Sequence, residues 1–184
     1  IVSVEAPSVT FLRNDLSPEN LVSTALFAAG AACAILGPEE RGPALVDSSM
    51  YHFPASTHLM GYDLTNDGLK IVLDRDVPDA IAGHFERYFY PLLERNGLGI
   101  ADVAHFVFHP GGKKIVQSVE KILAPFSKNV DASKKVLREF GNLSSATVLF
   151  VLDEVMRSGA RDGDWGYLLA FGPGFSAQSV LLRW

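Results

Sequence analysis

Apolar residues along the chain recur with two periods, one typical of strands and one typical of helices. Short runs rich in apolar and β-branched residues, several of them ended by Gly or Pro, predict strands. Stripes at helical spacing predict helices, and Val77, Ile81 and Phe85 belong to one such stripe. The predicted strands are 2–11, 31–36, 45–50, 59–64, 69–73, 103–108, 165–171 and 176–184. The predicted helices are 18–26, 76–96, 113–123, 132–140 and 142–157.

Capping and turn-forming residues mark where these elements begin and end. Ser17 is expected to cap the first helix. The sequence Asn-Asp-Gly at 66–68 predicts a hairpin turn. Gly97 and Gly141 are expected to end helices. Since strands alternate with helices, the sequence predicts a layered α/β arrangement.

Two segments consist almost entirely of apolar residues, so they are expected in the interior. Residues 31–36 predict a buried strand, and residues 146–152 predict a helical segment buried on every side. Residues 39–42 predict a turn, and the stretch 38–43, with Pro at both ends, is the best candidate for a boundary between two halves.

Composition and charge narrow the class of protein. The 184 residues fit one ordinary domain and are 48% hydrophobic. The net charge is −5, and no basic run is longer than Lys113-Lys114 or Lys134-Lys135, which argues against a nucleic-acid partner. The longest apolar runs fall short of the ~20 residues that span a bilayer, so no membrane association is expected.

The single cysteine, Cys33, excludes a disulfide within the chain and a zinc site of the usual spacing, so no metal is expected. A reducing, cytoplasmic setting is therefore the expectation. Cys33 lies among alanines with no basic neighbour, which favours a small buried residue over a nucleophile. The chain opens on Ile1 without a charged leader, so we expect residues that precede it to be missing.

Two polar residues occupy positions where functional residues are often found. His109 follows an apolar strand and precedes Pro-Gly-Gly, and α/β folds place their sites at such strand ends. It could equally be a partly exposed loop histidine. Asn142 follows Gly141 before a helix and could simply be its N-cap. Nothing in their spacing places the two residues together.

Four motifs in order change this picture. They are His-Pro-Gly-Gly at 109–112, Gly-Asn-Leu-Ser-Ser-Ala at 141–146, Leu-Phe-Val-Leu-Asp-Glu at 149–154 and Phe-Gly-Pro-Gly-Phe at 171–175, with shorter matches at 9–11, 25–27 and 76–78. Their order and spacing resemble the C-terminal portion of type III polyketide synthases, the family of chalcone and stilbene synthases.

The resemblance implies a thiolase-like fold, in which two related halves form αβαβα layers, and a homodimer. Residues 1–40 would end the N-terminal half, and residues 41–184 would form the C-terminal half. The family needs no cofactor. It loads an acyl group from a CoA thioester onto a cysteine, decarboxylates malonyl-CoA, condenses the two and cyclises the product. That cysteine lies upstream of the segment matched here, so the partner is a cysteine-bearing N-terminal half, and this chain alone is expected to be inactive.

The resemblance also assigns roles to individual residues. His109 and Asn142 match the catalytic histidine and asparagine, whose N–H groups stabilise the negative charge that develops on a thioester oxygen. The other matched positions line the substrate and CoA tunnel or shape the cavity. They are Thr10, Phe27, Ile71, Gly111, Gly112 and Ser144 for the tunnel, and Gly172, Pro173 and Gly174 for the cavity loop.

Two departures from the family pattern stand out. Plant members usually place a gating phenylalanine where this chain has Ile71, which predicts a wider, more aliphatic pocket. Lys113 and Lys114 replace Pro-Ala at the start of a helix, where they could hold the anionic CoA or simply form a solvated helix end.

Two alternatives remain at this point. A ketoacyl-acyl carrier protein synthase III uses the same residue types but typically has His-Gln-Ala-Asn at 109–112. A non-catalytic partner subunit of the same fold would lack the nucleophile, but it would have no chemical need for His109 and Asn142.

Overall fold

The computed structural model describes residues 1–38 and 42–184. Its centre is a four-stranded mixed sheet in the order β3-β8-β7-β6. The strands are β3 (Ala44–His52), β6 (Val103–Phe108), β7 (Trp165–Gly172) and β8 (Ser176–Arg183). β6 pairs parallel with β7, whereas β8 runs antiparallel to both β7 and β3. The site described below lies at the carboxyl end of β6.

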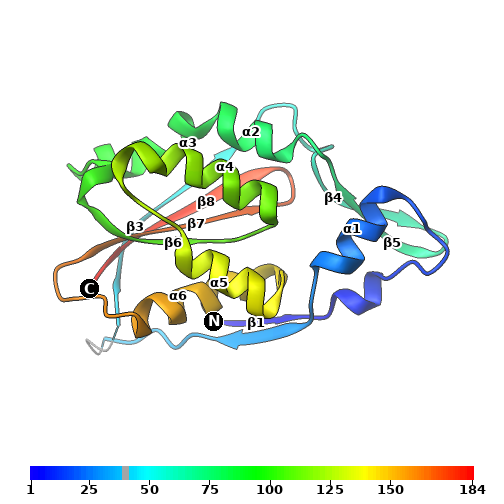
Figure 1. Cartoon of the computed structure of the whole chain (residues 1–184), viewed down its shortest axis with the longest axis horizontal. Helices are drawn as coiled ribbons and strands as arrows, with labels where there is room; N and C mark the ends of the chain where they lie inside the picture. Colours follow the sequence, from blue (N-terminus) through cyan, green and yellow to red (C-terminus); the bar gives the residue numbers. More distant parts are fainter. Residues whose placement is uncertain (39–41) are drawn as a thin grey trace.

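Helices cover both faces of this sheet (Figure 1). On one face lie α2 (Val77–Gly83), α3 (Phe85–Glu94) and α4 (Lys113–Leu123). On the other lie α5 (Asp131–Phe140) and α6 (Thr147–Arg157). Alternation along β6 divides the core, because Phe106 and Phe108 pack on the first side and Val107 on the second. The three layers confirm the predicted α/β arrangement.

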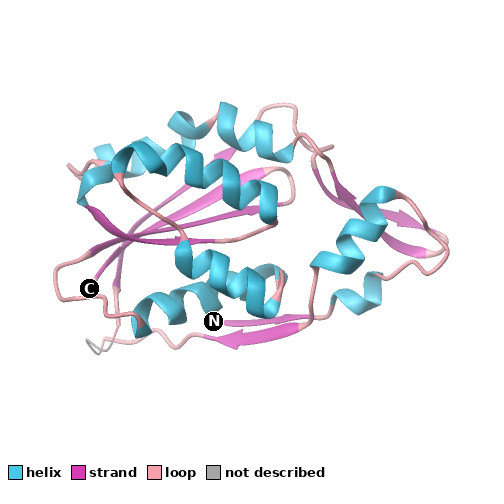
Figure 2. Cartoon of the chain, in the orientation of Figure 1, coloured by secondary structure: helices cyan, strands magenta, loops and turns pink. Residues whose placement is uncertain are grey.

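A second, smaller part is built from the first residues of the chain. β1 (Val2–Glu5) pairs antiparallel with β2 (Gly30–Cys33), and α1 (Pro18–Leu26) lies between them in sequence. Figure 2 shows this strand pair beyond α5 and α6, on the side away from the central sheet. The hairpin of β4 (Met60–Thr65) and β5 (Gly68–Leu73) packs beside α1.

In β1 the polar side chains face the rest of the chain. Ser3 and Glu5 face the turn η4 (Ser144–Ala146) and hydrogen-bond Ser145. Val2 and Val4 point outward and are 73% and 72% exposed. Within residues 1–38 only Asn20 and Ser23 are buried, so this part has no apolar core of its own in the chain described.

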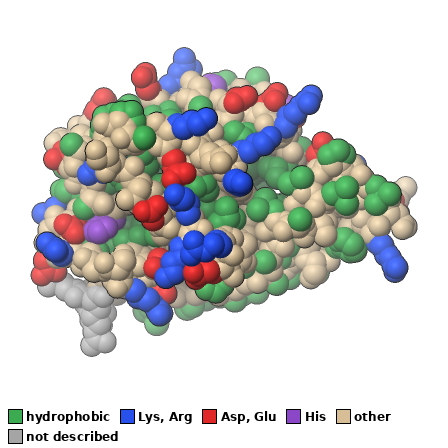
Figure 3. All heavy atoms as spheres, in the orientation of Figure 1, with side chains coloured by type: hydrophobic (Ala, Val, Ile, Leu, Met, Phe, Trp, Pro, Cys, Tyr) green, Lys and Arg blue, Asp and Glu red, His purple; other side chains and the backbone are tan. Residues whose placement is uncertain are grey.

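Exposed apolar residues continue from this part over α1 and the β4–β5 hairpin. Leu21, Val22 and Leu64 are all exposed. Figure 3 shows green apolar side chains gathered at this end of the molecule, whereas basic and acidic side chains gather over α4, α5 and α6. None of the helices in the described residues is long and apolar enough to cross a membrane.

Several predicted boundaries are confirmed, and local chemistry explains them. The Ser17 hydroxyl accepts the backbone N–H of Asn20 and caps α1 as predicted. The hairpin turn at 66–68 is present, with Thr65 opposite Gly68. Gly97 and Gly141, both with positive φ, follow the ends of α3 and α5.

Other predictions were wrong at the level of single elements. The strand predicted over 2–11 ends at Glu5, because Pro7 starts a 3₁₀ turn, η1 (Pro7–Thr10). The single helix predicted over 76–96 is broken at His84, directly after Gly83, a poor helix former. The turn predicted at 39–42 falls mostly outside the described residues, as does the proposed 40/41 domain boundary.

The two segments predicted to be buried are only partly so. β2 spans Gly30–Cys33, and its residues Ala31 and Cys33 are exposed. In α6, Val151 and Val155 are buried against the sheet, whereas Phe150 and Leu152 are half-buried. α6 also begins at Thr147 rather than after Asn142. Among the described residues, no layer covers the outer faces of these two segments.

Candidate active site

His109 directly follows β6 at the carboxyl end of the central sheet. Its backbone N–H donates to the Leu169 carbonyl at 2.8 Å, which extends the pairing with β7 by one residue. The imidazole is partly buried, and neither of its ring nitrogens has a hydrogen-bond partner among the described residues. Desolvation lowers the pKa of His109 to about 4. The imidazole is therefore neutral at pH 7 and carries one N–H that it can donate.

The loop after His109 contains two glycines, of which Gly111 has a neighbour closer than an added Cβ would normally have. The Gly111 N–H donates to the His109 carbonyl at 2.9 Å. A Cβ at Gly111 would lie 3.1 Å from Ile115 Cδ1, which is tight, and 3.6 Å from His109 Cδ2, an ordinary contact, so Gly111 lies beside the imidazole. Gly112 precedes α4 and faces Leu26, the last residue of α1.

Asn142 is brought to the same loop from the other side of the sheet. Gly141, with a φ of +77°, ends α5 and turns the chain. The backbone of Asn142 then bridges to Phe27: its N–H donates to the Leu26 carbonyl at 3.0 Å, and its carbonyl accepts from Ala28 at 2.9 Å. Asn142 itself is 2% exposed.

The carboxamide of Asn142 is held at both ends. Nδ2 donates to the Gly111 carbonyl at 3.0 Å, and Oδ1 accepts from the Ser144 N–H at 2.9 Å. The predicted capping role is thus present in modified form, in the turn before α6. Because an amide nitrogen has two hydrogens, one N–H of Asn142 has no hydrogen-bond partner among the described residues. His109 and Asn142, which are 33 positions apart, therefore meet at Gly111.

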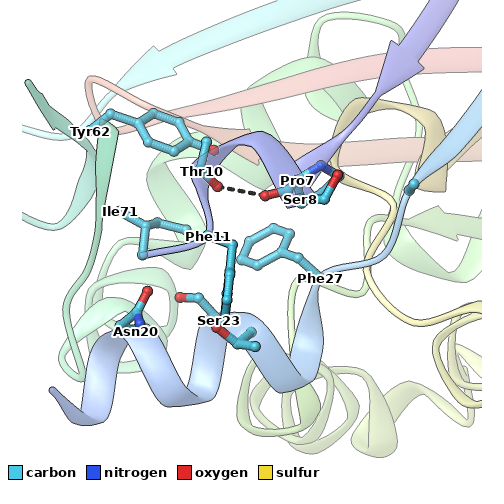
Figure 4. Close-up of a pocket in the computed structure, with 11 residues that line it drawn as sticks. Pro7, Ser8, Thr10, Phe11, Asn20, Ser23, Phe27, Tyr62 and Ile71 are labelled. Atoms are coloured by element: carbon cyan, nitrogen blue, oxygen red, sulfur yellow. Dashed lines mark hydrogen bonds between the residues drawn. The ribbon is translucent and has the colours of Figure 1, made fainter. Parts of the chain in front are cut away.

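A pocket of about 290 Å³ has Phe27 in its lining, but neither His109 nor Asn142. Three predicted tunnel residues, Thr10, Phe27 and Ile71, line it together (Figure 4). Phe27 connects the pocket to the pair His109 and Asn142, since its backbone neighbours bond Asn142. The structure adds residues that the sequence did not single out, among them Phe11 and Tyr62. Tyr62 stands opposite Ile71 in the β4–β5 register, so the predicted hairpin was the one signal that could have indicated it.

The remaining predicted site residues lie outside this pocket. Gly111, Gly112 and Ser144 lie around His109 and Asn142 instead. The turn at 172–174 connects β7 to β8, and because β6 and β7 are parallel it lies at the same sheet edge as His109. Cys33 ends β2 opposite Val2 and is exposed. Among the described residues, no three His, Cys, Asp or Glu side chains gather in a way that could hold a metal ion.

Comparison with known proteins places this geometry in a family. Residues 44–184 match the family described as chalcone and stilbene synthases, C-terminal domain. The chain is 37% identical to a 1,3,6,8-tetrahydroxynaphthalene synthase of Streptomyces peucetius subsp. caesius, covering 100% of this chain and 50% of the relative. It is 31% identical to a putative chalcone synthase of Bacillus subtilis, again over 100% of this chain and 53% of the relative.

Solved structures agree with these matches. The crystal structure of 1,3,6,8-tetrahydroxynaphthalene synthase from Streptomyces coelicolor A3(2), a bacterial type III polyketide synthase, superposes with a TM-score of 0.91 at 28% identity. The match covers 100% of this chain and 53% of that one. The type III polyketide synthase domain of Steely1 from Dictyostelium gives 0.84 at 27% identity, over 99% of this chain and 52% of that one.

The chain thus spans about half the length of the relatives it matches, and it shares their thiolase-like α/β fold. This family assignment agrees with the four sequence motifs, with the helix–sheet–helix layers and with the meeting of His109 and Asn142. The chain belongs to the chalcone and stilbene synthase family, the type III polyketide synthases, and contains the family's C-terminal domain.

Proposed function

We propose that this chain supplies the histidine and asparagine of a decarboxylating polyketide synthase whose cysteine nucleophile lies on a further segment. The observation that carries the proposal is the meeting of a neutral imidazole and a fixed carboxamide at Gly111, each with an N–H to give. Two such donors aimed at one oxygen stabilise an oxyanion. The matched family and relatives favour this reading over a ketoacyl-acyl carrier protein synthase.

The proposed chemistry uses the pair at the step where charge develops. Loss of CO₂ from malonyl-CoA moves the electrons of the broken C–C bond into an enolate, and the negative charge resides on the thioester oxygen. The N–H groups of His109 and Asn142 bind that oxygen. The enolate carbon then attacks the acyl group on the cysteine, a C–C bond forms, and the C–S bond breaks to release the thiolate. Because both donors are held before the substrate arrives, little reorganisation is needed.

The pocket beside the pair supports a place for the growing product. Its lining of Phe11, Phe27 and Ile71 is mainly apolar, with Thr10 and Asn20 adding polar groups. Its volume of about 290 Å³ is at the lower end for small-molecule sites. We infer that the extended chain folds and cyclises here, and that CoA thioesters are the substrates.

The uncovered apolar surfaces support a partner. Val2 and Val4 point out of β1, and the outer side of α6 is half-exposed. An apolar surface of this kind marks an interaction site. We infer that the cysteine-bearing half of the enzyme covers this surface and that two complete enzymes pair as a homodimer. We also propose that the protein acts in the cytoplasm, where a single free cysteine such as Cys33 is ordinary.

The test uses this chain together with its cysteine-bearing segment. Native mass spectrometry with and without iodoacetamide should find a rapidly alkylated cysteine outside this chain, and the assembly should release CO₂ from malonyl-CoA. Asn142→Ala should lower that rate by about 10²–10³. Asn129→Ala, at an exposed loop amide, serves as the matched control and should leave the rate unchanged. An assembly with an alkylatable cysteine but no turnover of malonyl-CoA would refute the proposal.

A further inference from the structure

Thr147 lies directly beneath the turn that carries Asn142. It is the first residue of α6 and is fully buried. Its hydroxyl donates to the Ser144 carbonyl at 2.8 Å and lies 3.4 Å from Asn142 Oδ1. A hydroxyl has only one hydrogen to donate. The shorter contact therefore holds it, and Thr147 acts chiefly on the backbone of Ser144.

Ser144 has an unusual backbone conformation for a residue with a side chain. Its φ is +52°, in the left-handed region. A non-glycine residue is strained there, and the conformation persists only where its surroundings fix it. Here the Ser144 N–H is bound by Asn142 Oδ1, and its carbonyl accepts both the backbone N–H and the hydroxyl of Thr147.

These contacts form a chain that ends at the catalytic amide. The Thr147 hydroxyl holds the Ser144 peptide, the Ser144 N–H holds Asn142 Oδ1, and the opposite end of that carboxamide donates to the Gly111 carbonyl. The bonds at the oxygen and at the nitrogen of the Asn142 carboxamide together set the direction of its second N–H. If the oxygen end loosens, the amide keeps only its bond to Gly111 and can rotate about it.

We propose that Thr147 is a positioning residue for the Asn142 carboxamide, acting through the left-handed turn at Ser144. This inference rests on the proposed function. Loss of the Thr147 hydroxyl leaves the donor present but poorly aimed. The decarboxylation rate should therefore fall about tenfold, less than the 10²–10³ that loss of an entire oxyanion donor costs. Substrate binding should be unaffected, since Thr147 faces the turn rather than the pocket.

The experiment compares Thr147→Val with Thr147→Ser in the complete enzyme. Valine keeps the branched shape and loses the hydroxyl, whereas serine keeps the hydroxyl. We expect Thr147→Val to lower kcat for malonyl-CoA decarboxylation about tenfold, with KM and the alkylation rate of the cysteine within twofold of wild type. Thr147→Ser should restore kcat. Wild-type kcat in Thr147→Val, or a Thr147→Ser as slow as Thr147→Val, would overturn the inference.

A second variant keeps the test decisive if Thr147→Val does not fold. Glycine adopts a positive φ without strain, so Ser144→Gly combined with Thr147→Val should fold and recover most of the lost kcat. A folded double variant that is still at least tenfold slow would also overturn the inference. Wild type and Asn142→Ala are measured in the same assay. If wild type itself does not turn over malonyl-CoA, the proposed function has failed, whereas an active wild type with an equally active Thr147→Val refutes only the role of Thr147.

Discussion

The edge strand that leads to His109 depends on one buried serine. In the part of the chain that the structure describes, β6 has a neighbouring strand on one side only, because it ends the sheet order β3-β8-β7-β6. The His109 N–H points towards β7, where it meets Leu169. The Phe108 carbonyl belongs to the same trans peptide group as the His109 N–H and points in the opposite direction, so it faces the open edge of the sheet. The Ser133 hydroxyl of α5, which is fully buried, donates to that carbonyl at 2.6 Å.

Ser133→Ala should therefore destabilise the protein and displace His109. The substitution removes the donor and leaves a buried carbonyl without its partner, which costs about 1–3 kcal/mol. For a chain of this size each kcal/mol lowers Tm by roughly 2–4 °C. Urea titration followed by tryptophan fluorescence is a direct measure, because Trp165 begins β7 and Trp184 follows β8 in the same sheet.

Ser158→Ala provides the matched control. Its hydroxyl bonds the Val155 carbonyl at the exposed end of α6, so the change should stay within about 0.5 kcal/mol of wild type. If Ser133→Ala is no less stable than Ser158→Ala, the Phe108 carbonyl has another partner. The argument that α5 fixes the end of β6 would then be wrong.

Three further changes test the site. The pKa of His109 is about 4 in the folded protein against an ordinary value of 6.5, so the unfolded chain binds the proton more readily. The free energy of unfolding should therefore fall as the pH is lowered from about 6.5 to about 4, by at most about 3 kcal/mol. If the urea midpoint of His109→Gln falls equally over this pH range, the reasoning is wrong. Ile71→Phe in the complete enzyme should narrow the pocket and reduce use of bulky starter thioesters; an unchanged starter profile would show that position 71 does not gate. Replacing Lys113 and Lys114 with Glu at the exposed start of α4 should raise KM for malonyl-CoA, and an unchanged KM would favour a solvated helix end.

Local patterns predicted most elements because local chemistry determines them. α4 was predicted from residue 113 to 123 and observed over Lys113–Leu123. β6 was likewise predicted over 103–108. The apolar pattern could not indicate which part of the protein covers a given apolar face. Val2 and Val4 alternate as a half-buried strand should, yet within this chain it is Ser3 and Glu5 that face inward.

The site was predictable in its residue types but not in its geometry. His109 and Asn142 were found from motifs, and their roles came with the resemblance. Their meeting at the Gly111 carbonyl depends on the sheet, on Gly141 and on the bridge to Phe27, which are long-range features. Nothing in the sequence indicated roles for Thr147 and Ser133. Whether a hydroxyl on a helix is buried depends on the elements that pack against it, which the local sequence does not show.

The absence of an apolar core in residues 1–38 has a consequence for how the protein responds to heat. Segments with few buried apolar contacts open locally at lower free energy than the core. In this chain such a segment includes Glu5, which binds Ser145, and Phe27, whose neighbours bind the backbone of Asn142. When it opens, the asparagine loses its supports while the central sheet stays folded. In this chain by itself, the arrangement around Asn142 would then be lost locally and reversibly, before global melting.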